Sequence, residues 1–592
     1  MQFKRLRRRV KKQFKYQQKQ VEHLSAVTEK TIERNLFRRF SRLKPVRRFI
    51  FGWTLLMVLL IGCLIAQFQQ LSTYYQEVRP VPGGIYSEGI IGSISNVNPI
   101  YATSDVDRSL SRLVFAGLLT YDVNGKLANN LASKYEVGEN GRVYTVTLKR
   151  GLTWHDGKPL TSADVVFTYN TIKDPDARSP LLAGWQNIAV TAQSDYVVTF
   201  TLPSTLASFP YNLTTGIVPQ HILGKVSAAN MRSTDFNTLS PVGAGPFKWH
   251  GLQVSGNDPS DVEEQVALLP FENYTLGKPK LNEFIMRAYA SEERLTQAFK
   301  SGQLTAAAGL NQLPKDAPKS AQKHDMLLSA GTYVFFKTTN ETLSSVKVRQ
   351  ALVAATQPAQ VISGLDFKTR PVTAPLLLGQ VAYNKDYAQK TGDVVTAKRL
   401  LTEEGWQPGP GGLLLKNGKP LVFSLIATDT PEYRSVSSEL RKQWQSIGVR
   451  VDVQLVSATD YGTTLASHDY DATLYGVSVG EDPDVYVYWD GSQADVRSNS
   501  RLNLSEWNNA TANSALEAGR TRLDNQLRAI KYAPFLQAWQ QEAPALGLYQ
   551  PRFLYITRGP LHGLSDHSIT NSISRFNGVE NWQIRSARVT VE

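Results

Sequence analysis

The sequence predicts an α/β protein with more than one domain, preceded by a single transmembrane helix. Its 592 residues exceed what one hydrophobic core usually serves, so two to four domains are expected. Residues 421–479 alternate between strand and helix patterns, which is typical of a parallel sheet covered by helices. Phe49–Ala66 is a run of 18 uncharged and mostly apolar residues.

The positive net charge belongs to the N-terminal tail alone. Residues 1–48 hold 17 Lys and Arg against 3 Asp and Glu, which equals the net charge of +14 of the whole chain. The remaining residues carry 48 basic and 48 acidic side chains and are therefore neutral. A neutral body has no excess of positive charge to attract a polyanion, so a nucleic-acid partner is not expected.

The apolar run is predicted to anchor the chain in the cell membrane. As a helix it spans about 27 Å, enough for the hydrocarbon core. Lys44, Arg47 and Arg48 precede it, which favours a cytoplasmic N-terminus and an extracytoplasmic body. The alternative is a helix buried in a protein core. The predicted order is a basic cytoplasmic tail (1–48), a transmembrane anchor (49–66) and a stalk (67–84).

Cys63 is the only cysteine, and it lies within the apolar run. The body therefore forms no internal disulfide and offers no Cys-ligated metal site. Leu60–Cys63 resembles a lipobox, so lipidation of Cys63 after removal of the preceding segment is an alternative to a retained anchor. The retained anchor is favoured because 48 residues precede the run and because Leu64–Ala66 continues it.

The first part of the body combines several local signals in a short stretch. Leu113–Leu119 is an apolar run, and Asn124–Gly125 is a turn dipeptide. Val143–Leu148 alternates apolar and polar residues, as a half-buried strand does. Thr161 followed by Asp164 predicts a helix that starts with a capping box.

The later part predicts a β–α–β–α–β series. Strands are expected at 421–427, 449–455 and 472–479, and Thr430 with Pro431 begins the first helix between them. Ligands bind outside the carboxyl ends of such strands. The end of the third strand is therefore a candidate site, with Tyr475, Val477, Ser478, Val479, Glu481, Asp482 and the nearby Trp489 as candidate ligand-binding residues.

Two patterns raise the question of catalysis. Gly476–Gly480 matches the G-x-S-x-G pattern of serine hydrolases, and His562 or His567 could act with Ser478. The helix should begin directly after the serine, whereas the better helix start lies at residues 482–483. His155 and Asp156 are adjacent and fit a turn better than a catalytic pair. A protein that is not an enzyme, with no metal or cofactor, is therefore expected, with a hydrolase as a minor alternative.

The stretch Asn98–Tyr169 and six later segments together resemble a known family. The segments are GAGPFKW (Gly243–Trp249), NYTLGKPKLNEFIMR (Asn273–Arg287), SVKVRQALVAATQPAQVI (Ser345–Ile362), AKRLLTEEGW (Ala397–Trp406), ELRKQWQSIGVRVDVQ (Glu439–Gln454) and APALGLYQPRFLYIT (Ala543–Thr557). In this order they are similar to extracytoplasmic solute-binding proteins of the oligopeptide/dipeptide ABC-transporter family.

The resemblance implies a two-lobed periplasmic-binding-protein-like fold of type II with an extra subdomain. The implied boundaries are lobe I at 85–118 and 243–332, the extra subdomain at 119–242, lobe II at 333–542 and a return to lobe I at 543–592. A peptide or related small solute would be held between the lobes and passed to the permease subunits of an ABC importer. The alternative is a bilobed receptor or envelope interaction protein without a transport role.

The resemblance also implies site residues, and it shows one departure. Thr103, Ser104, Asp105 and Tyr549 are implied to face the cleft. Peptide-binding members hold the ligand's ammonium group with an Asp in a segment resembling GW-x-x-D. Here Gly476 takes the Trp position and Val479 the Asp position, with Glu481 or Asp482 as nearby substitutes. Ordinary recognition of a free peptide N-terminus is therefore in doubt.

Overall fold

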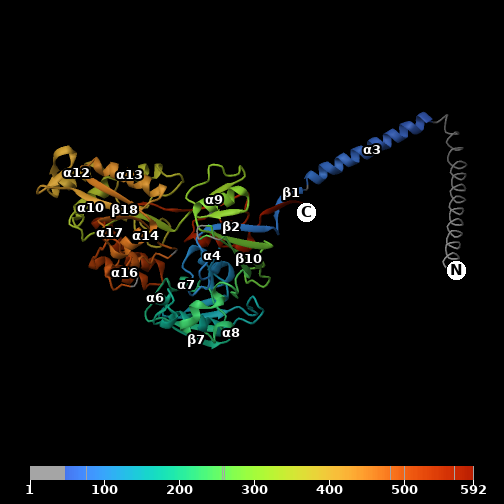
Figure 1. Ribbon diagram of the computed structural model, residues 1–592, viewed down its shortest axis with the longest axis horizontal. Helices are drawn as coiled ribbons and strands as arrows, with labels where there is room; N and C mark the ends of the chain where they lie inside the picture. Colours follow the sequence, from blue (N-terminus) through green and yellow to red (C-terminus); the bar gives the residue numbers. More distant parts are fainter. Residues whose placement is uncertain are drawn as a thin grey trace. The chain divides into compact units, whose positions relative to one another are not determined.

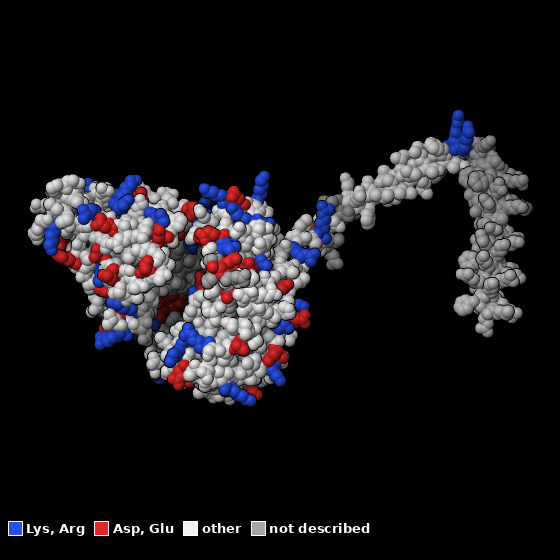
Figure 2. All heavy atoms as spheres, in the orientation of Figure 1, with Lys and Arg blue, Asp and Glu red and all other residues white. Residues whose placement is uncertain are grey.

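The computed structural model describes residues 47–74, 76–256, 258, 261–480, 482–498, 501–565 and 567–590. The chain divides into two units, one formed by Met1–Arg79 with Ser586–Glu592 and the other by Pro80–Arg585, which we call the body. Residues 1–46 of the predicted basic tail lie outside the described residues. On the visible face of the body, acidic and basic side chains are interspersed (Figure 2), as its neutral composition requires.

In the described part of the first unit, the long helix α3 (Arg47–Tyr74) includes the whole predicted anchor (Figure 1). Its stretch Arg47–Gln70 is long and apolar enough to cross a membrane. The apolar side chains of this stretch, such as Trp53 and Leu59, are exposed. The predicted stalk is thus helical as far as Tyr74. It continues as strand β1 (Gln76–Val81), which pairs with β23 (Arg585–Thr590).

Lobe I is built on a seven-stranded sheet in the order β13-β22-β12-β2-β11-β10-β9. The strands are β2 (Ile85–Ile91), β9 (Phe247–Ser255), β10 (Glu263–Pro270), β11 (Glu283–Tyr289), β12 (Ala306–Ala308), β13 (Gln322–Leu327) and β22 (Arg552–Thr557). The first strand, β2, runs parallel to β11 and β12, whereas β22 pairs antiparallel with β12 and β13. Helix α9 (Glu292–Ser301) ends at Gly302, which adopts the left-handed conformation at φ 87°.

The predicted extra subdomain contains an antiparallel sheet in the order β5-β6-β8-β7. Its strands are β5 (Ala132–Val137), β6 (Val143–Leu148), β7 (Ala189–Ser194) and β8 (Val197–Thr201), and a small sheet pairs β3 (Leu119–Tyr121) with β4 (Leu127–Asn129). The predicted strand Val143–Leu148 is confirmed, and every second residue of it is buried. Helix α5 (Ser162–Lys173) begins with the predicted capping box, in which the Thr161 backbone N–H donates to Asp164 Oδ2 at 2.9 Å.

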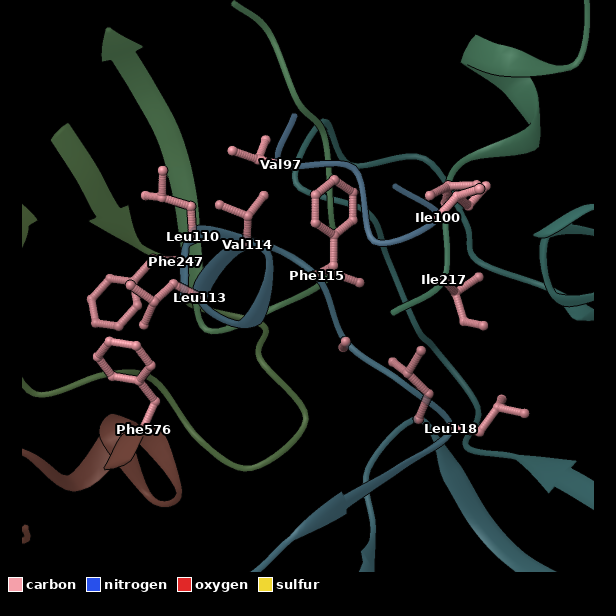
Figure 3. Packing of buried hydrophobic residues seen from close by; sticks show 14 of the residues in the cluster. Val97, Ile100, Leu110, Leu113, Val114, Phe115, Leu118, Ile217, Phe247 and Phe576 are labelled. Carbon is pink, nitrogen blue, oxygen red and sulfur yellow. The ribbon is translucent and has the colours of Figure 1, made fainter. Parts of the chain in front are cut away.

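Helix α4 (Asp105–Val114) lies where lobe I, the subdomain and the C-terminal segment meet. Figure 3 shows the side chain of Leu113 beside the rings of Phe247 of β9 and Phe576 of the C-terminal segment, and Leu110 belongs to the same cluster. The chain then continues past Phe115 into the subdomain. One hydrophobic cluster therefore joins all three parts. Shorter helices of this region are α6 (Leu182–Trp185), α7 (Phe209–Asn212) and α8 (Gln220–Leu223).

Lobe II is built on a five-stranded sheet in the order β19-β18-β20-β14-β21. Its strands are β14 (Ala330–Phe336), β18 (Val422–Thr428), β19 (Arg450–Val456), β20 (Ala472–Ser478) and β21 (Ala545–Tyr549), and a small sheet holds β15 (Gln407–Pro408), β16 (Leu414–Lys416) and β17 (Lys419–Pro420). Strand β18 is parallel to β19 and β20, so the β–α–β–α–β prediction is confirmed. Two antiparallel strands, β14 and β21, complete the sheet.

Helices cover the sheet of lobe II. They are α10 (Val346–Ala355), α11 (Pro358–Ser363), α12 (Val394–Glu403), α13 (Pro431–Gln445), α14 (Ala458–Ser467), α15 (Tyr486–Trp489), α16 (Ala510–Arg520) and α17 (Asn525–Glu542). As the sequence predicts, Thr430 caps α13 and Pro431 is its first residue. Its buried residues Val436, Leu440 and Trp444 belong to the core of the lobe.

The chain passes between the two large sheets twice. The first crossing separates β13 from β14 at residues 328–329, and the second separates β21 from β22 at residues 550–551. The sequence predicts that lobe II extends from residue 333 to residue 542. In the structure β14 begins at Ala330 and β21 ends at Tyr549, so the sheet of lobe II extends beyond both predicted boundaries. The crossings are hydrogen-bonded to each other, since Leu328 N donates to Pro551 O at 2.9 Å and Gln550 Nε2 donates to Leu328 O at 3.2 Å. Two hydrogen-bonded crossings between two lobes are an arrangement typical of a hinge.

Candidate functional site

A cavity of 1180 Å³ lies beside the two crossings, and we call it the interlobe cavity. Residues of lobe I line one side of it, including Lys323, Asp325 and Ser329. The loop of residues 365–381 in lobe II lines the other side, and Gln550 of the second crossing lies between them. Figure 2 shows the hollowed face between lobe II, on the left, and lobe I with its subdomain.

Arg552, just after the second crossing, ties the two lobes together at the edge of this cavity. Its side chain is only 5% exposed, and its guanidinium forms ion pairs with Asp325 at 2.5 Å and with Asp366 at 2.8 Å. Asp325 belongs to β13 of lobe I, whereas Asp366 belongs to the loop of lobe II. The guanidinium also lies over the ring of Phe367, 4.4 Å from its centroid.

Lys323 adds a second positive charge to the same cluster. Its ammonium lies 3.2 Å from Asp325 Oδ2 and donates to the backbone carbonyl of Asp366 at 3.1 Å. Both carboxylates that line the cavity therefore have cationic partners within the protein. This cluster positions the loop of lobe II against β13.

The loop of lobe II is also fixed to the second crossing through its backbone. Gln550 N donates to Arg370 O at 2.9 Å, Pro371 forms an isolated bridge with Tyr549, and the Thr369 hydroxyl donates to Gln550 O. Residues 369–371 thus run as a short extended segment beside β21. Lys368 and Arg370 are exposed side chains that line the cavity.

A second cavity of 400 Å³ lies at the carboxyl end of β18 and the start of α13. It shares Leu365 and Asp366 with the interlobe cavity. Glu432 lines it and accepts a hydrogen bond from the Tyr549 hydroxyl at 2.7 Å. Burial raises the pKa of the Glu432 carboxyl above its usual value. Tyr549, predicted to face the cleft, is thus a buried residue whose hydroxyl contacts a residue of this second cavity.

Two residues after the end of β20, Gly480 lines the interlobe cavity and is the only described residue of the predicted segment 475–482 that does so. Gly480 O accepts from Gln380 Nε2 at 2.6 Å. Val477 and Val479 point into the core of lobe II, being 3% and 6% exposed. Ser478 is exposed, and its carbonyl accepts from the Tyr488 hydroxyl at 2.8 Å. Glu481 lies outside the described residues.

The carboxylates after this strand serve internal ion pairs. Asp482 accepts two hydrogen bonds from Arg528 of α17, at 2.7 and 2.8 Å, and both side chains are at most 10% exposed. Asp484 accepts from Arg520 at 2.9 Å and from the hydroxyl of Ser208 in the subdomain at 3.1 Å. The pairs of Asp482 with Arg528 and of Asp484 with Arg520 are internal to lobe II, whereas the hydrogen bond from Ser208 to Asp484 joins lobe II to the subdomain.

The remaining predicted site residues lie away from the lining of the interlobe cavity. Trp489 is 1% exposed and stacks on Phe335, with ring centroids 5.4 Å apart. Tyr475 is partly buried, with its ring 6.1 Å from that of Tyr461. Ser104 caps α4 by accepting from Asp107 N at 3.0 Å, Asp105 pairs with Arg108 at 2.9 Å, and Thr103 is exposed.

The patterns that raised the question of catalysis have structural roles. Ser478 is the last residue of β20 and pairs with Ala330, and the next helix begins only at Tyr486, so the tight strand-to-helix turn of a hydrolase is not formed. His155 Nδ1 accepts from Gly243 N at 3.3 Å, whereas Asp156 contacts His221 at 2.7 Å. Within the described ranges, no group of three His, Cys, Asp or Glu side chains could hold a metal ion.

Several residues of the cavity were not predicted from the sequence. Lys323 and Asp325 lie on a strand, and Lys368 and Arg370 lie in a loop that matches no motif. The expected two-lobed fold could have pointed to these residues. Such a fold has two crossings between its lobes, and its ligands bind beside them. Locating the crossings at 328–329 and 550–551 would have directed attention to the residues that flank them.

The comparisons with known proteins agree with this architecture. Residues 126–498 match the bacterial extracellular solute-binding proteins, family 5 (middle). The oligopeptide-binding protein AppA of Bacillus subtilis is 26% identical over 513 residues, covering 84% of this chain and 91% of AppA. The match covers most of both sequences.

Solved structures are similar to the body as well. The ABC transporter substrate-binding protein CtaP of Listeria monocytogenes has a TM-score of 0.72 and 24% identity, covering 85% of this chain and 99% of CtaP. Bacillus subtilis AppA, solved in complex with a nonapeptide, has a TM-score of 0.68 and 24% identity, covering 86% of this chain and 100% of AppA. These neighbours have the type II periplasmic-binding-protein fold. The chain belongs to the bacterial extracellular solute-binding proteins of family 5.

Proposed function

We propose that this protein is a membrane-anchored binding protein that captures peptides between its lobes and presents them to the permease of an ABC importer. The observation that carries the proposal is the interlobe cavity, which both lobes line beside the hinge. Its 1180 Å³ lies slightly above the range of about 300–1,000 Å³ that is typical of sites for drug-sized molecules. A short peptide in an extended conformation is a ligand of suitable size.

Peptides are favoured over other solutes by two considerations. A relative that aligns with 84% of this chain is named an oligopeptide-binding protein. The cavity lining is also rich in polar groups, including Ser329, Gln380 and Gln550. The backbone of an extended peptide needs donors and acceptors of this kind once it leaves water.

Closure of the lobes over a ligand is supported by contacts on the side of the subdomain. Ala207 N donates to Arg520 O at 2.9 Å, and the Ser208 hydroxyl donates to Asp484. These contacts join the subdomain to lobe II. Their residues are far in sequence from the two crossings. Hinge motion would break and remake them, so they stabilise the conformation in which the lobes meet.

Anchoring through α3 is the second part of the proposal. The helix carries exposed apolar side chains along Arg47–Gln70, and basic residues stand at its N-terminal end. These features support a retained anchor with a cytoplasmic N-terminus. Intact-mass measurement of the protein purified from membranes tests this part. A chain that begins at a lipidated Cys63 would show that the preceding residues are removed.

The ligand class is tested with the full-length protein in detergent or nanodiscs. Thermal-shift and calorimetric titrations with peptide pools of defined length should show stabilisation by a subset of the pools. Stabilisation only by non-peptide solutes would reject the peptide assignment. Co-purification from native membranes tests delivery: permease subunits are expected, whereas a signalling or envelope partner alone would favour a receptor role.

A further inference from the structure

We propose that the interlobe cavity selects ligands that carry a negatively charged group, and that Lys368 and Arg370 bind this group. The inference rests on the proposed function, since it concerns the ligand held between the lobes. The charged groups that line the cavity, and their partners within the protein, support it.

The positive charges around the cavity outnumber the negative ones. The lining includes the carboxylates of Asp325 and Asp366, but Arg552 pairs with both of them and Lys323 with Asp325. Within the described residues, these pairs neutralise the acidic lining. Lys368 and Arg370 remain as exposed cations, and His567 is the other titratable group in the lining.

The backbone places Lys368 and Arg370 on the same side. They are separated by one residue in a segment that is extended where it runs beside β21, and alternate side chains of an extended segment share a side. Thr369 between them points the other way and donates its hydroxyl to Gln550 O. The hydrogen bond from Gln550 N to Arg370 O fixes the segment further. Two cations on one fixed segment can bind one anionic group together.

A ligand with a positively charged ammonium group would need a free carboxylate near the end of β20. The ion pairs of the described carboxylates there, Asp482 and Asp484, do not favour this kind of recognition. Both oxygens of Asp482 accept from Arg528, and Asp484 Oδ2 accepts from Arg520 and Ser208. An ammonium bound to Asp482 would have to displace Arg528 from a nearly buried ion pair, which is unfavourable. The charge of the site therefore favours an anionic ligand.

The negative group of a peptide can be its C-terminal carboxylate or an acidic side chain. Both present the same carboxylate chemistry to Lys368 and Arg370. A set of matched pentapeptides separates them, with Glu or Gln at the central position, each with a free or an amidated C-terminus. Calorimetry on the full-length protein in nanodiscs measures the affinity for each peptide.

The key variant is the double substitution Lys368→Gln with Arg370→Gln. Its matched control is Lys390→Gln with Arg441→Gln, which removes the same charges from exposed positions outside the cavity lining. We expect the double variant to bind the favoured acidic peptide about tenfold more weakly, as loss of charge-assisted hydrogen bonds implies. The control variant should bind it like the wild type, and high salt should weaken wild-type binding.

The outcomes separate this inference from the function on which it rests. If the wild type binds all the peptides equally, or if the double variant keeps full affinity for the acidic peptides, peptides are ligands but the charge selection is refuted. If Glu matters and amidation does not, the acidic side chain is the group bound, and the reverse result identifies the C-terminus. If no peptide binds, the proposed function is wrong and this inference falls with it.

Discussion

Arg575 donates two hydrogen bonds to Glu88 Oε1, at 2.6 and 3.1 Å, in an ion pair whose side chains are completely buried. Glu88 lies on β2, the first strand of lobe I, and Arg575 lies close to the C-terminus. The hydroxyl of Tyr555 donates to the other carboxylate oxygen at 2.5 Å, and Ser109 Oγ accepts from the same guanidinium at 3.0 Å. The first strand of the body is thus bound to its last segment.

The substitution Arg575→Met is expected to lower the free energy of unfolding by about 3–5 kcal/mol, because it leaves the Glu88 carboxylate buried without its partner. Urea unfolding followed by tryptophan fluorescence measures the change. The control is Arg497→Met, which removes an exposed partner of Asp495 and should leave the free energy of unfolding almost unchanged. Equal losses in the two variants would show that the buried pair has no special role.

The stability of the body should rise with pH between about 4 and 6.5 because of His155. Burial lowers the pKa of this imidazole to about 4, and its Nδ1 accepts from Gly243 N, which requires the neutral form. In this window the unfolded chain binds a proton that the folded chain does not bind. The contribution is therefore complete above pH 6.5 and is lost as the pH falls toward 4, by at most about 3 kcal/mol.

The variant His155→Asn should show a shallower dependence of the melting temperature on pH in this window. The exposed His250 provides a control, since His250→Asn should keep the wild-type slope. The substitution also changes the absolute stability, so the slope of the melting temperature against pH is the quantity to compare. A slope that is unchanged in His155→Asn would assign the pH dependence to other groups.

The capping box of α5 should be measurable as a local contribution to stability. The hydroxyl of Thr161 accepts from Ala163 N at 3.3 Å, and the Thr161 N–H donates to Asp164. Thr161→Ala should lower the free energy of unfolding by about 1 kcal/mol. Thr161→Ser keeps the oxygen and should retain most of the stability in the same urea titration. If both variants lose the same amount, the methyl group and not the cap is responsible.

The contact between Ser208 and Asp484 should prolong the ligand-bound state. Ser208→Ala removes one hydrogen bond to a charged acceptor across the lobes, worth about 1 kcal/mol in the closed conformation. We expect ligand to dissociate several-fold faster, with association little changed, in stopped-flow measurements. Ser204→Ala changes an exposed serine nearby and should have no effect. An unaltered dissociation rate in Ser208→Ala would separate this contact from closure.

The parts of the fold that were predicted correctly depend on residues close in sequence. The alternation in Val143–Leu148, the capping box at Thr161 and Asp164, and the start of α13 at Thr430 and Pro431 each need only a few neighbouring residues. The helix start expected at residues 482–483 is wrong, because Asp482 pairs with Arg528, 46 positions away. Its Oδ1 also accepts from Asp484 N at 3.0 Å, which forms a local turn, and the helix begins only at Tyr486.

The candidate site could be predicted only in outline. Topology placed it beyond the end of β20, and Gly480 there lines the interlobe cavity. The cationic residues Lys323, Lys368 and Arg370 come from β13 and from a loop of lobe II. They meet because the chain crosses between the lobes beside them, and no local pattern encodes this proximity. The same limit explains why Trp489 was placed near the ligand although it packs in the core.

The position of β22 in the seven-stranded sheet determines the order in which the body can fold. Lobe II is a continuous stretch from β14 to β21, so all strands of its sheet are available once β21 has been synthesised. The sheet of lobe I forms later, because β2 pairs with β12, and β12 with β22, which follow it only far along the chain. Contacts of such long sequence separation form slowly. A nascent chain therefore exposes an unfinished sheet until β22 has been synthesised, and truncation before β22 should send it to proteolysis.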